Sequence, residues 1–387
     1  MQTKDRSLTN SDSQDEAMQQ QIARDRVTRF LENKFRVSRS YPTITTYRHT
    51  VHRFLKFLRI KYNLDISQIL IQIKEKKTRD SLEVLDDYYS YLSQYKRGTK
   101  RYQNSTIVQY LTIAKEFLNG EGCKIYHEDL KQRFRMPKVS KVYEKGLTKE
   151  ILNRLIRFAN PKLATAIILA CTTGLRIAEM VQLHLSSIDF STNPTTIIVR
   201  AETTKTRETR VTHTTSEGTK VLRDYICREN LQNDGYLFLL QNGKTQGNHD
   251  EEYIAKRVRS TVQNLEKQLA HLVSTIPELN YKNDNGRNAI HFHSFRAWMK
   301  TQITLEKQSD FSEALLGHHS LKLVYFRQND SARRKTYLSI EHALTLADTE
   351  KIDPNFSDLQ KDNYELRGIL DSLSKQLRNL EKEIHQN

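Results

Sequence analysis

Residues 291–337 read HFHSFRAWMKTQITLEKQSDFSEALLGHHSLKLVYFRQNDSARRKTY. This stretch combines imidazole, guanidinium and phenol groups, which are the side chains that can surround a phosphodiester. The candidate groups within it are His293, Arg296, His318, Tyr325 and Tyr337. His293 and Arg296 are three positions apart, so on a helix they share one face. These groups can form one site only if the rest of the chain supplies matching partners.

The composition favours a polyanionic partner. The chain has 387 residues, a length typical of two domains. Lys and Arg total 62 against 46 Asp and Glu, a formal net charge of +16. An excess of this size indicates nucleic acid binding, and the alternative is a basic protein without a nucleic acid partner.

The cellular setting is predicted to be reducing and cytoplasmic. Three scattered cysteines, Cys123, Cys171 and Cys227, form no Cys-x-x-Cys pair, which argues against a disulfide framework or a cysteine-rich zinc site. The N-terminal residues are polar throughout, so we expect neither a signal peptide nor a membrane anchor. No apolar run approaches the roughly 18 residues that a spanning helix needs.

Hydrophobic periodicity predicts five regions along the chain. They are a disordered N-terminus (1–20), a helical domain of about four helices (21–132), a basic linker (133–146), a second domain (147–350) and a C-terminal heptad helix (355–387). The linker carries Pro137 and is either a solvated loop or a phosphate contact. The heptad helix is either a coiled coil for self-association or a helix that packs on its own domain.

The second domain is predicted to contain helices and a small antiparallel sheet. Residues 161–181 are the most apolar part of the chain and predict a buried helix that turns at Gly174 into another helix. The β-rich runs 195–200 and 209–215 bracket a polar turn. The expected fold class is therefore mainly α with a small antiparallel β-sheet (α+β).

Two further segments could complete a site. A turn at Gly174 would place Arg176 near a helix N-terminus, where backbone N–H groups favour an anion. Lys205 lies in the turn between the two predicted strands, from which one ammonium could enter a site. The alternatives are an Arg176 that simply pairs with Glu179 on the surface and a Lys205 that is only solvated.

In this order the motifs resemble those of the tyrosine recombinases, the family of phage and plasmid integrases and Xer-like recombinases. The motifs are Gly174-Leu175-Arg176-x-x-Glu179, Lys205, His293-x-x-Arg296, Leu315-Leu316-Gly317-His318 and a following tyrosine. The resemblance covers about residues 20–345. It implies a core-binding (SAM-like) helical domain followed by a catalytic domain.

The resemblance also implies a role for each matched residue. Arg176 and Arg296 would clamp the non-bridging oxygens of a scissile phosphate, a task that suits planar guanidinium forks. Lys205 would protonate the 5′-hydroxyl leaving group. His293 would assist proton transfer at the nucleophile and His318 would hydrogen-bond the phosphate, although the neighbouring His319 could compete. Glu179 would provide structural support.

The nucleophile is predicted to be one of two tyrosines. In the family it follows the Gly-His histidine by roughly nine or ten positions, whereas Tyr325 is seven and Tyr337 nineteen positions after His318. Tyr325 fits the spacing better, and Tyr337 lies on its own predicted helix. Trp298, the single tryptophan, is expected to be a core aromatic.

The predicted function is site-specific DNA recombination (integration) through a covalent 3′-phosphotyrosine, without metal, ATP or any other cofactor. The expected partner is double-stranded DNA, bound by a homo-tetramer on paired sites, with DNA-bending accessory factors as a further option. One alternative is a non-catalytic DNA-binding or architectural protein derived from an integrase. Another is a metal-dependent nuclease with ligands from His291, His293, His318 and His319, which the nearby cations disfavour.

Overall fold

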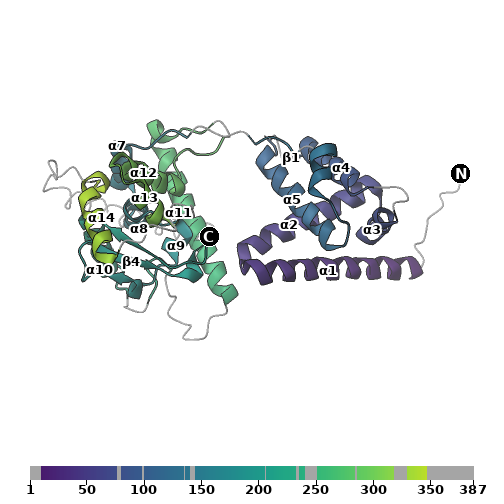
Figure 1. Cartoon of the computed structure of the whole chain (residues 1–387), viewed down its shortest axis with the longest axis horizontal. Helices are drawn as coiled ribbons and strands as arrows, with labels where there is room; N and C mark the ends of the chain where they lie inside the picture. Colours follow the sequence, from purple (N-terminus) through teal and green to yellow (C-terminus); the bar gives the residue numbers. More distant parts are fainter. Residues whose placement is uncertain are drawn as a thin grey trace, which may run out of the picture. The chain divides into compact units, whose positions relative to one another are not determined.

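A computed structural model describes residues 10–75, 80–97, 100–134, 136–139, 144–204, 206–231, 235–239, 251–283, 286–317 and 329–346. The chain divides into two compact units, Met1–Lys141 and Val142–Asn387. The fold is mainly helical with a small antiparallel sheet, as predicted (Figure 1). The predicted heptad helix 355–387 lies outside the described residues. Within those residues, no helix is both long and apolar enough to cross a membrane.

The first unit is built from helices and one short hairpin. Its elements are α1 (Asn10–Ser38), α2 (Tyr41–Tyr62), α3 (Ile66–Lys74), α4 (Ser81–Gln94), β1 (Lys96–Arg97), β2 (Lys100–Arg101), α5 (Asn104–Gly120) and α6 (His127–Arg133). Local signals explain the ends of α2: the Ser40 hydroxyl caps its N-terminus, and Asn63 ends it in the left-handed region at φ 53°. In the core, the Tyr88 ring lies 5.0 Å from the rings of both Phe54 and Phe57.

Three details of this unit differ from the predictions. The prediction of disorder up to residue 20 is wrong from Asn10 onwards, because α1 begins there. Residues 10–20 lack apolar periodicity but contain several good helix formers, namely three Gln, one Glu, one Ala and one Met, which favour a helix without needing a core. The short helix α3 was missed, although Asp65 and Gln68 form a capping box at its start. The described part of this unit contains six helices, α1–α6, rather than about four.

The second unit surrounds a small sheet with helices. Its elements are α7 (Lys149–Phe158), α8 (Pro161–Thr173), α9 (Ile177–Val181), η1 (Leu185–Ser187), β3 (Ile188–Asp189), β4 (Thr195–Val199), η2 (Ala201–Thr203), β5 (Arg210–Thr214), α10 (Ser216–Arg228), α11 (Glu251–Thr275), η3 (Pro277–Leu279), α12 (Phe292–Leu305), α13 (Ser309–Leu316) and α14 (Asp330–Leu344). The strands are antiparallel in the order β3-β4-β5. The predicted hairpin is therefore confirmed, and β3 is an additional strand.

Helix α8 is the centre of this unit. Asn160 caps its start, Pro161 occupies its first turn, and Gly174 ends it in the left-handed region. It contacts α7, α10, α12 and β5, so its side chains are buried nearly all round. This explains why the sequence is uniformly apolar here and lacks the stripe of a surface helix. Trp298 on α12 is buried in the same core, as predicted.

Helix α14, yellow-green in Figure 1, packs on α12 and against the edge strand β5, where Arg333 donates to the Val211 carbonyl. Tyr337 on this helix is 0% exposed, and its hydroxyl donates to the Thr172 carbonyl at the end of α8, 2.8 Å away. The Tyr337 ring packs edge-on against the His213 imidazole of β5, with centroids 5.4 Å apart. The end of α14 is held by Glu341, which accepts a hydrogen bond from the Ser216 amide of α10.

The buried His213 is expected to make the protein sensitive to acid. Burial, followed by Arg333 and Arg334, lowers the pKa of His213 to about 4, and its Nε2 has no hydrogen-bond partner among the described residues. The ordinary pKa near 6.5 applies in the unfolded chain, so unfolding takes up a proton between pH 6.5 and pH 4. At about 1.4 kcal/mol per pKa unit, the free energy of unfolding should fall by roughly 3 kcal/mol over this window.

Denaturant titrations of wild type and His213→Gln between pH 7 and pH 4 would measure this effect. The variant should lose less stability on acidification, because a glutamine amide does not titrate. His271→Gln, at an exposed histidine of α11 in the same unit, provides the control and should follow the wild type. Parallel pH profiles of His213→Gln and wild type would contradict the assignment.

Candidate active site

The site begins at the turn that Gly174 makes between α8 and α9. Gly174 has φ 64°, a conformation that L side chains rarely adopt. A Cβ at this position would lie 2.6 Å from both Leu316 Cδ2 and Met299 Sδ, so the close packing of α12 and α13 also requires glycine. The turn buries Leu175 and makes Arg176 the N-cap residue of α9, as the sequence predicted.

Arg176 is oriented by Glu179, one turn further along. The Arg176 backbone amide donates to Glu179 Oε2 at 2.9 Å, and its Nη1 donates to Oε1 at 2.7 Å. The Arg176 side chain remains 29% exposed, so part of the guanidinium faces solvent. Arg176 therefore does pair with Glu179, and it also remains accessible to a ligand.

A second arginine, Arg210 at the start of β5, binds the same carboxylate. Its Nη2 and Nη1 donate to Glu179 Oε2 and Oε1 at 2.5 and 3.1 Å, and its Nε donates to the Leu315 carbonyl at 3.0 Å. Burial would raise the pKa of Glu179, but the hydrogen bonds and charge of Arg210, helped by Arg176, lower it. Glu179 is therefore an ionised, buried carboxylate between two guanidinium groups.

Arg296 of α12 completes the group from the other side. It is 2% exposed, and its Nη2 donates to the Leu316 carbonyl at 2.6 Å while Nη1 donates to the Gly174 carbonyl. These carbonyls lie at the ends of α13 and α8, where the helix dipole favours a cation. Burial lowers the pKa of Arg296 to about 9, which still leaves it charged at neutral pH.

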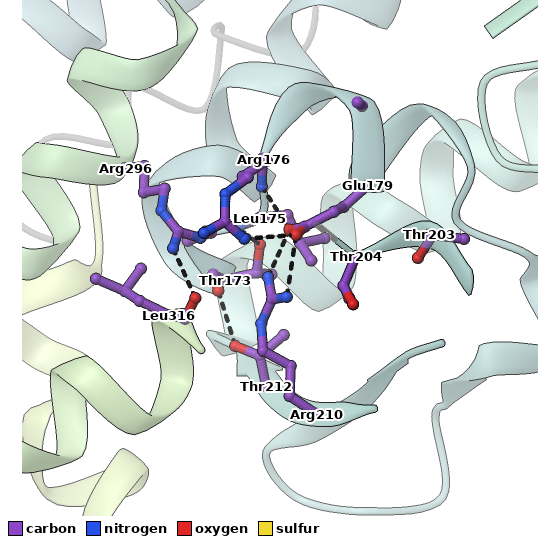
Figure 2. Close-up of polar contacts among 12 residues, drawn as sticks. Thr173, Leu175, Arg176, Glu179, Thr203, Thr204, Arg210, Thr212, Arg296 and Leu316 are labelled. Atoms are coloured by element: carbon purple, nitrogen blue, oxygen red, sulfur yellow. Dashed lines mark hydrogen bonds and ion pairs between the residues drawn. The ribbon is translucent and has the colours of Figure 1, made fainter. Parts of the chain in front are cut away.

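Figure 2 shows the three guanidinium groups gathered around Glu179 and the ends of α8 and α13. Three side-chain cations face one carboxylate, so the cluster keeps an excess of positive charge. Helix-end carbonyls hold Arg210 and Arg296, and Glu179 holds Arg176, so all three are in fixed positions before any ligand arrives. A preorganised cationic cluster of this kind is suited to bind an anion and to stabilise negative charge that develops on it.

His293 lies one turn before Arg296 on α12 and is exposed. Burial of part of the ring, then the charge of Arg296 and the neighbouring His291, lower the pKa of His293. The imidazole is therefore neutral at pH 7 and can accept a proton. The two imidazole centroids, of His291 and His293, are 6.3 Å apart.

The structure brings together three of the predicted site residues, Arg176, His293 and Arg296. Lys205, His318 and Tyr325 lie outside the described residues, as does His319. Gly317, the residue before His318, has φ 63°, and a Cβ there would lie 2.9 Å from Arg210 Cδ. Tyr337 is described and is fully buried in the core, with a pKa raised by burial well above its ordinary value.

Arg210 was missed in the sequence, although a signal was present. It belongs to the strand TRVTHT, in which Thr212 and Thr214 share its face and contact α8. A charged residue on a buried face needs a charged partner, because an unpaired buried charge is very unfavourable.

In the part of the chain that the structure describes, no group of three or more His, Cys, Asp or Glu residues could hold a metal ion.

Comparison with known structures returned similar chains of low identity. XerA recombinase is 20% identical over 82% of this chain and 98% of that one, with a TM-score of 0.33. The integrase from mycobacterium phage Brujita is 15% identical over 86% and 96%, with a TM-score of 0.37. The Tn1549 transposon integrase with circular intermediate DNA is 16% identical over 75% and 99%, with a TM-score of 0.46. Comparison with curated proteins gave no match.

The family comparison is specific to the second unit. Residues 145–332 match the phage integrase family. The matched range contains the Gly174 turn, Arg176, Glu179, Arg210 and Arg296, which form the cationic cluster described above. Residues 145–332 of the chain are therefore identified as a domain of the phage integrase family.

Proposed function

We propose that the protein is a site-specific DNA recombinase that cleaves and rejoins strands through a covalent 3′-phosphotyrosine. The observation that carries the proposal is the fixed arginine pair, Arg176 and Arg296, held by Glu179 and by helix-end carbonyls. Attack on a phosphodiester adds negative charge to its non-bridging oxygens, and two oriented guanidinium forks stabilise that charge. The protein itself supplies these cations, so the proposed chemistry needs no metal.

The other roles complete the reaction. Tyr325 is the proposed nucleophile, because the alternative, Tyr337, has its hydroxyl inside the core. The neutral imidazole of His293 takes part in proton transfer at the tyrosine, whose ordinary pKa near 10 calls for a neighbouring base. Lys205 protonates the 5′-oxygen that leaves, and His318 hydrogen-bonds the phosphate. Reversal of the same steps reseals the strand, since the phosphotyrosine retains the energy of the broken bond.

The test uses nicked fragments of genomic DNA from the source organism, incubated with the full chain in EDTA. A nick close to the cleavage site lets the short product strand diffuse away, which traps the covalent intermediate. An SDS-resistant protein–DNA adduct is the expected result. Sequencing the attached strand identifies the DNA sequence that is cleaved, which is called the recovered site below. DNA binding without any adduct would instead favour the non-catalytic, architectural alternative.

Double-stranded DNA is the proposed partner, and Arg53 of α2 is a proposed phosphate contact in the first unit. Its guanidinium carbon lies 5.1, 5.4 and 5.6 Å from the ring centroids of Tyr95, Tyr102 and Tyr110. Burial would lower the pKa of Arg53, but a hydrogen bond with Tyr95 and the other tyrosines raise it overall. Among the described residues no carboxylate pairs with Arg53, so the aromatic rings hold a cation whose charge is not neutralised.

Affinity for DNA is expected to fall steeply with salt, and Arg53→Gln is expected to make this dependence shallower. Each neutralised phosphate contributes about 0.9 to the slope of log K against log salt, so the variant should lose roughly one unit of slope. Lys61→Gln provides the control on the same helix, because Lys61 is paired with Asp87 at 3.3 Å. Filter-binding titrations at several salt concentrations measure the slopes, and an unchanged slope for Arg53→Gln would reject the contact.

By the resemblance, we also propose that the active assembly is a tetramer on two DNA sites. The strands of two sites must be exchanged, so each of four cleavages needs its own catalytic unit. Light scattering of the complex with the recovered site would measure the stoichiometry. A complex that never exceeds one chain per site would contradict this part of the proposal.

A further inference from the structure

Arg210 connects three separate parts of the catalytic unit. It lies at the start of β5, opposite Val199 of β4, and its side chain is only 8% exposed. Two of its nitrogens donate to Glu179 of α9, and its Nε donates to the Leu315 carbonyl of α13. Its side chain also lies against the backbone of Gly317, where a Cβ would be only 2.9 Å from Cδ.

These contacts lead to two of the proposed phosphate ligands. Glu179 is the group that orients Arg176, through both the backbone amide and Nη1. Leu315 and Gly317 are the end of α13, directly before His318. The adjacent carbonyl, of Leu316, accepts from Arg296. Arg210 thus closes a ring: hydrogen bonds lead to Glu179 and Arg176, the backbone leads from Arg176 to the Gly174 carbonyl, and Arg296 leads from that carbonyl back to the end of α13.

Arg210 itself is not placed to bind the substrate. All three nitrogens of its guanidinium group, Nε, Nη1 and Nη2, already donate to a protein oxygen. Without Arg210, Glu179 would have one cationic partner instead of two, and burial would favour its protonated form. Glu179 would then be held by fewer hydrogen bonds and would be partly protonated. It would no longer fix the guanidinium of Arg176 within the tolerance that phosphoryl chemistry needs.

We propose that Arg210 is a positioning residue for the recombination reaction, which acts through Glu179 on Arg176 and through the end of α13 on Arg296. The inference rests on the proposed function. It predicts that Arg210→Lys retains charge but loses the two-pronged contact with Glu179, because an ammonium cannot reproduce a planar fork. Single-turnover cleavage should fall by about 10- to 100-fold, the effect of a misplacement of roughly 1 Å.

The experiment compares cleavage of the recovered site with a normal phosphate and with a neutral methylphosphonate at the scissile position. The neutral ester has no charged non-bridging oxygen for Arg176 to hold. If Arg210 acts through Arg176, the wild-type to variant rate ratio should shrink on the methylphosphonate, as it should for Arg176→Gln. The double variant Arg176→Gln/Arg210→Lys should then cleave no more slowly than Arg176→Gln alone, since the two residues act as one unit.

Two further variants complete the design. Arg200→Lys, at an exposed arginine directly after β4, should cleave both substrates like wild type. If Arg210→Lys does not fold, as judged by thermal melting, Glu179→Gln tests the same connection and should show the same pattern.

Three results would overturn the inference: a wild-type rate for Arg210→Lys, an equal defect on both substrates, or a defect that multiplies with that of Arg176→Gln. Absence of any adduct from the wild type would instead reject the proposed function.

Discussion

Tyr325→Phe is expected to abolish the covalent protein–DNA adduct, whereas Tyr337→Phe is expected to retain it. The Tyr337 side chain is 0% exposed and its hydroxyl donates to the Thr172 carbonyl. Burial raises its pKa well above the ordinary value, which disfavours the phenolate that attacks phosphorus. To reach a phosphate, Tyr337 would have to leave the core and take part of α14 with it.

The Tyr337→Phe variant should be less stable but chemically competent. Removal of the hydroxyl leaves the buried Thr172 carbonyl without this donor, at a cost of about 1–2 kcal/mol. The phenyl ring still fills its place against His213, so α14 should remain in position. Thermal melting would report the loss of stability, and single-turnover cleavage of the recovered site should stay close to the wild-type rate.

The measurement is SDS-resistant adduct formation by each variant, followed by mass spectrometry of the DNA-linked peptide from the wild type. The linked peptide should contain Tyr325. Loss of the adduct in a folded Tyr337→Phe protein, or its persistence in Tyr325→Phe, would reverse the assignment. In that case α14 would have to leave the position that it occupies in the structure before cleavage.

The choice between these tyrosines shows what sequence patterns can establish. Both follow His318, and each lies near apolar residues, so spacing and periodicity fit either role. Burial depends on what α14 packs against, and α8 is more than 150 positions away along the chain. The same limit applies to Arg210, whose partner Glu179 lies in a separate element.

Other parts of the fold follow from local signals and were predictable. The turn at Gly174 is marked by a glycine after a long apolar run, and the β4–β5 hairpin by two β-rich runs around a polar turn. Arg176 and Arg296 were predicted as a pair through the family resemblance, and the structure places them beside each other. What sequence patterns did not show is how two arginines remain adjacent, which requires Glu179, Arg210 and helix-end carbonyls.

Arg296→Lys is expected to reduce the rate of cleavage by about 100- to 1,000-fold, the usual effect of removing one oriented donor from an oxyanion site. Arg296 donates to the Leu316 and Gly174 carbonyls with two different nitrogens. A lysine ammonium can reach one of them but cannot hold both and still present a flat edge to a phosphate. Burial would also lower the pKa of a lysine at this position, so its positive charge would depend on pH, unlike that of arginine.

The defect should lie in the chemical step more than in DNA binding. Phosphate contacts elsewhere on the chain are expected to provide most of the affinity, so the Kd for the recovered site should change by no more than a few fold. Stability should fall by about 1–3 kcal/mol, because one buried carbonyl loses its donor. Arg154→Lys, at a surface pair with Glu278 at 3.3 Å, is the control and should change neither rate nor melting temperature.

A folded Arg296→Lys protein that cleaves at the wild-type rate would mean that a point charge suffices at this position. The fork geometry would then have no catalytic role, and the contacts with Gly174 and Leu316 would serve only to join α8, α12 and α13. If cleavage is lost at saturating DNA while binding is retained, the same contacts serve both catalysis and helix packing. The same hydrogen bonds that hold the helices together would then also aim the guanidinium at the phosphate.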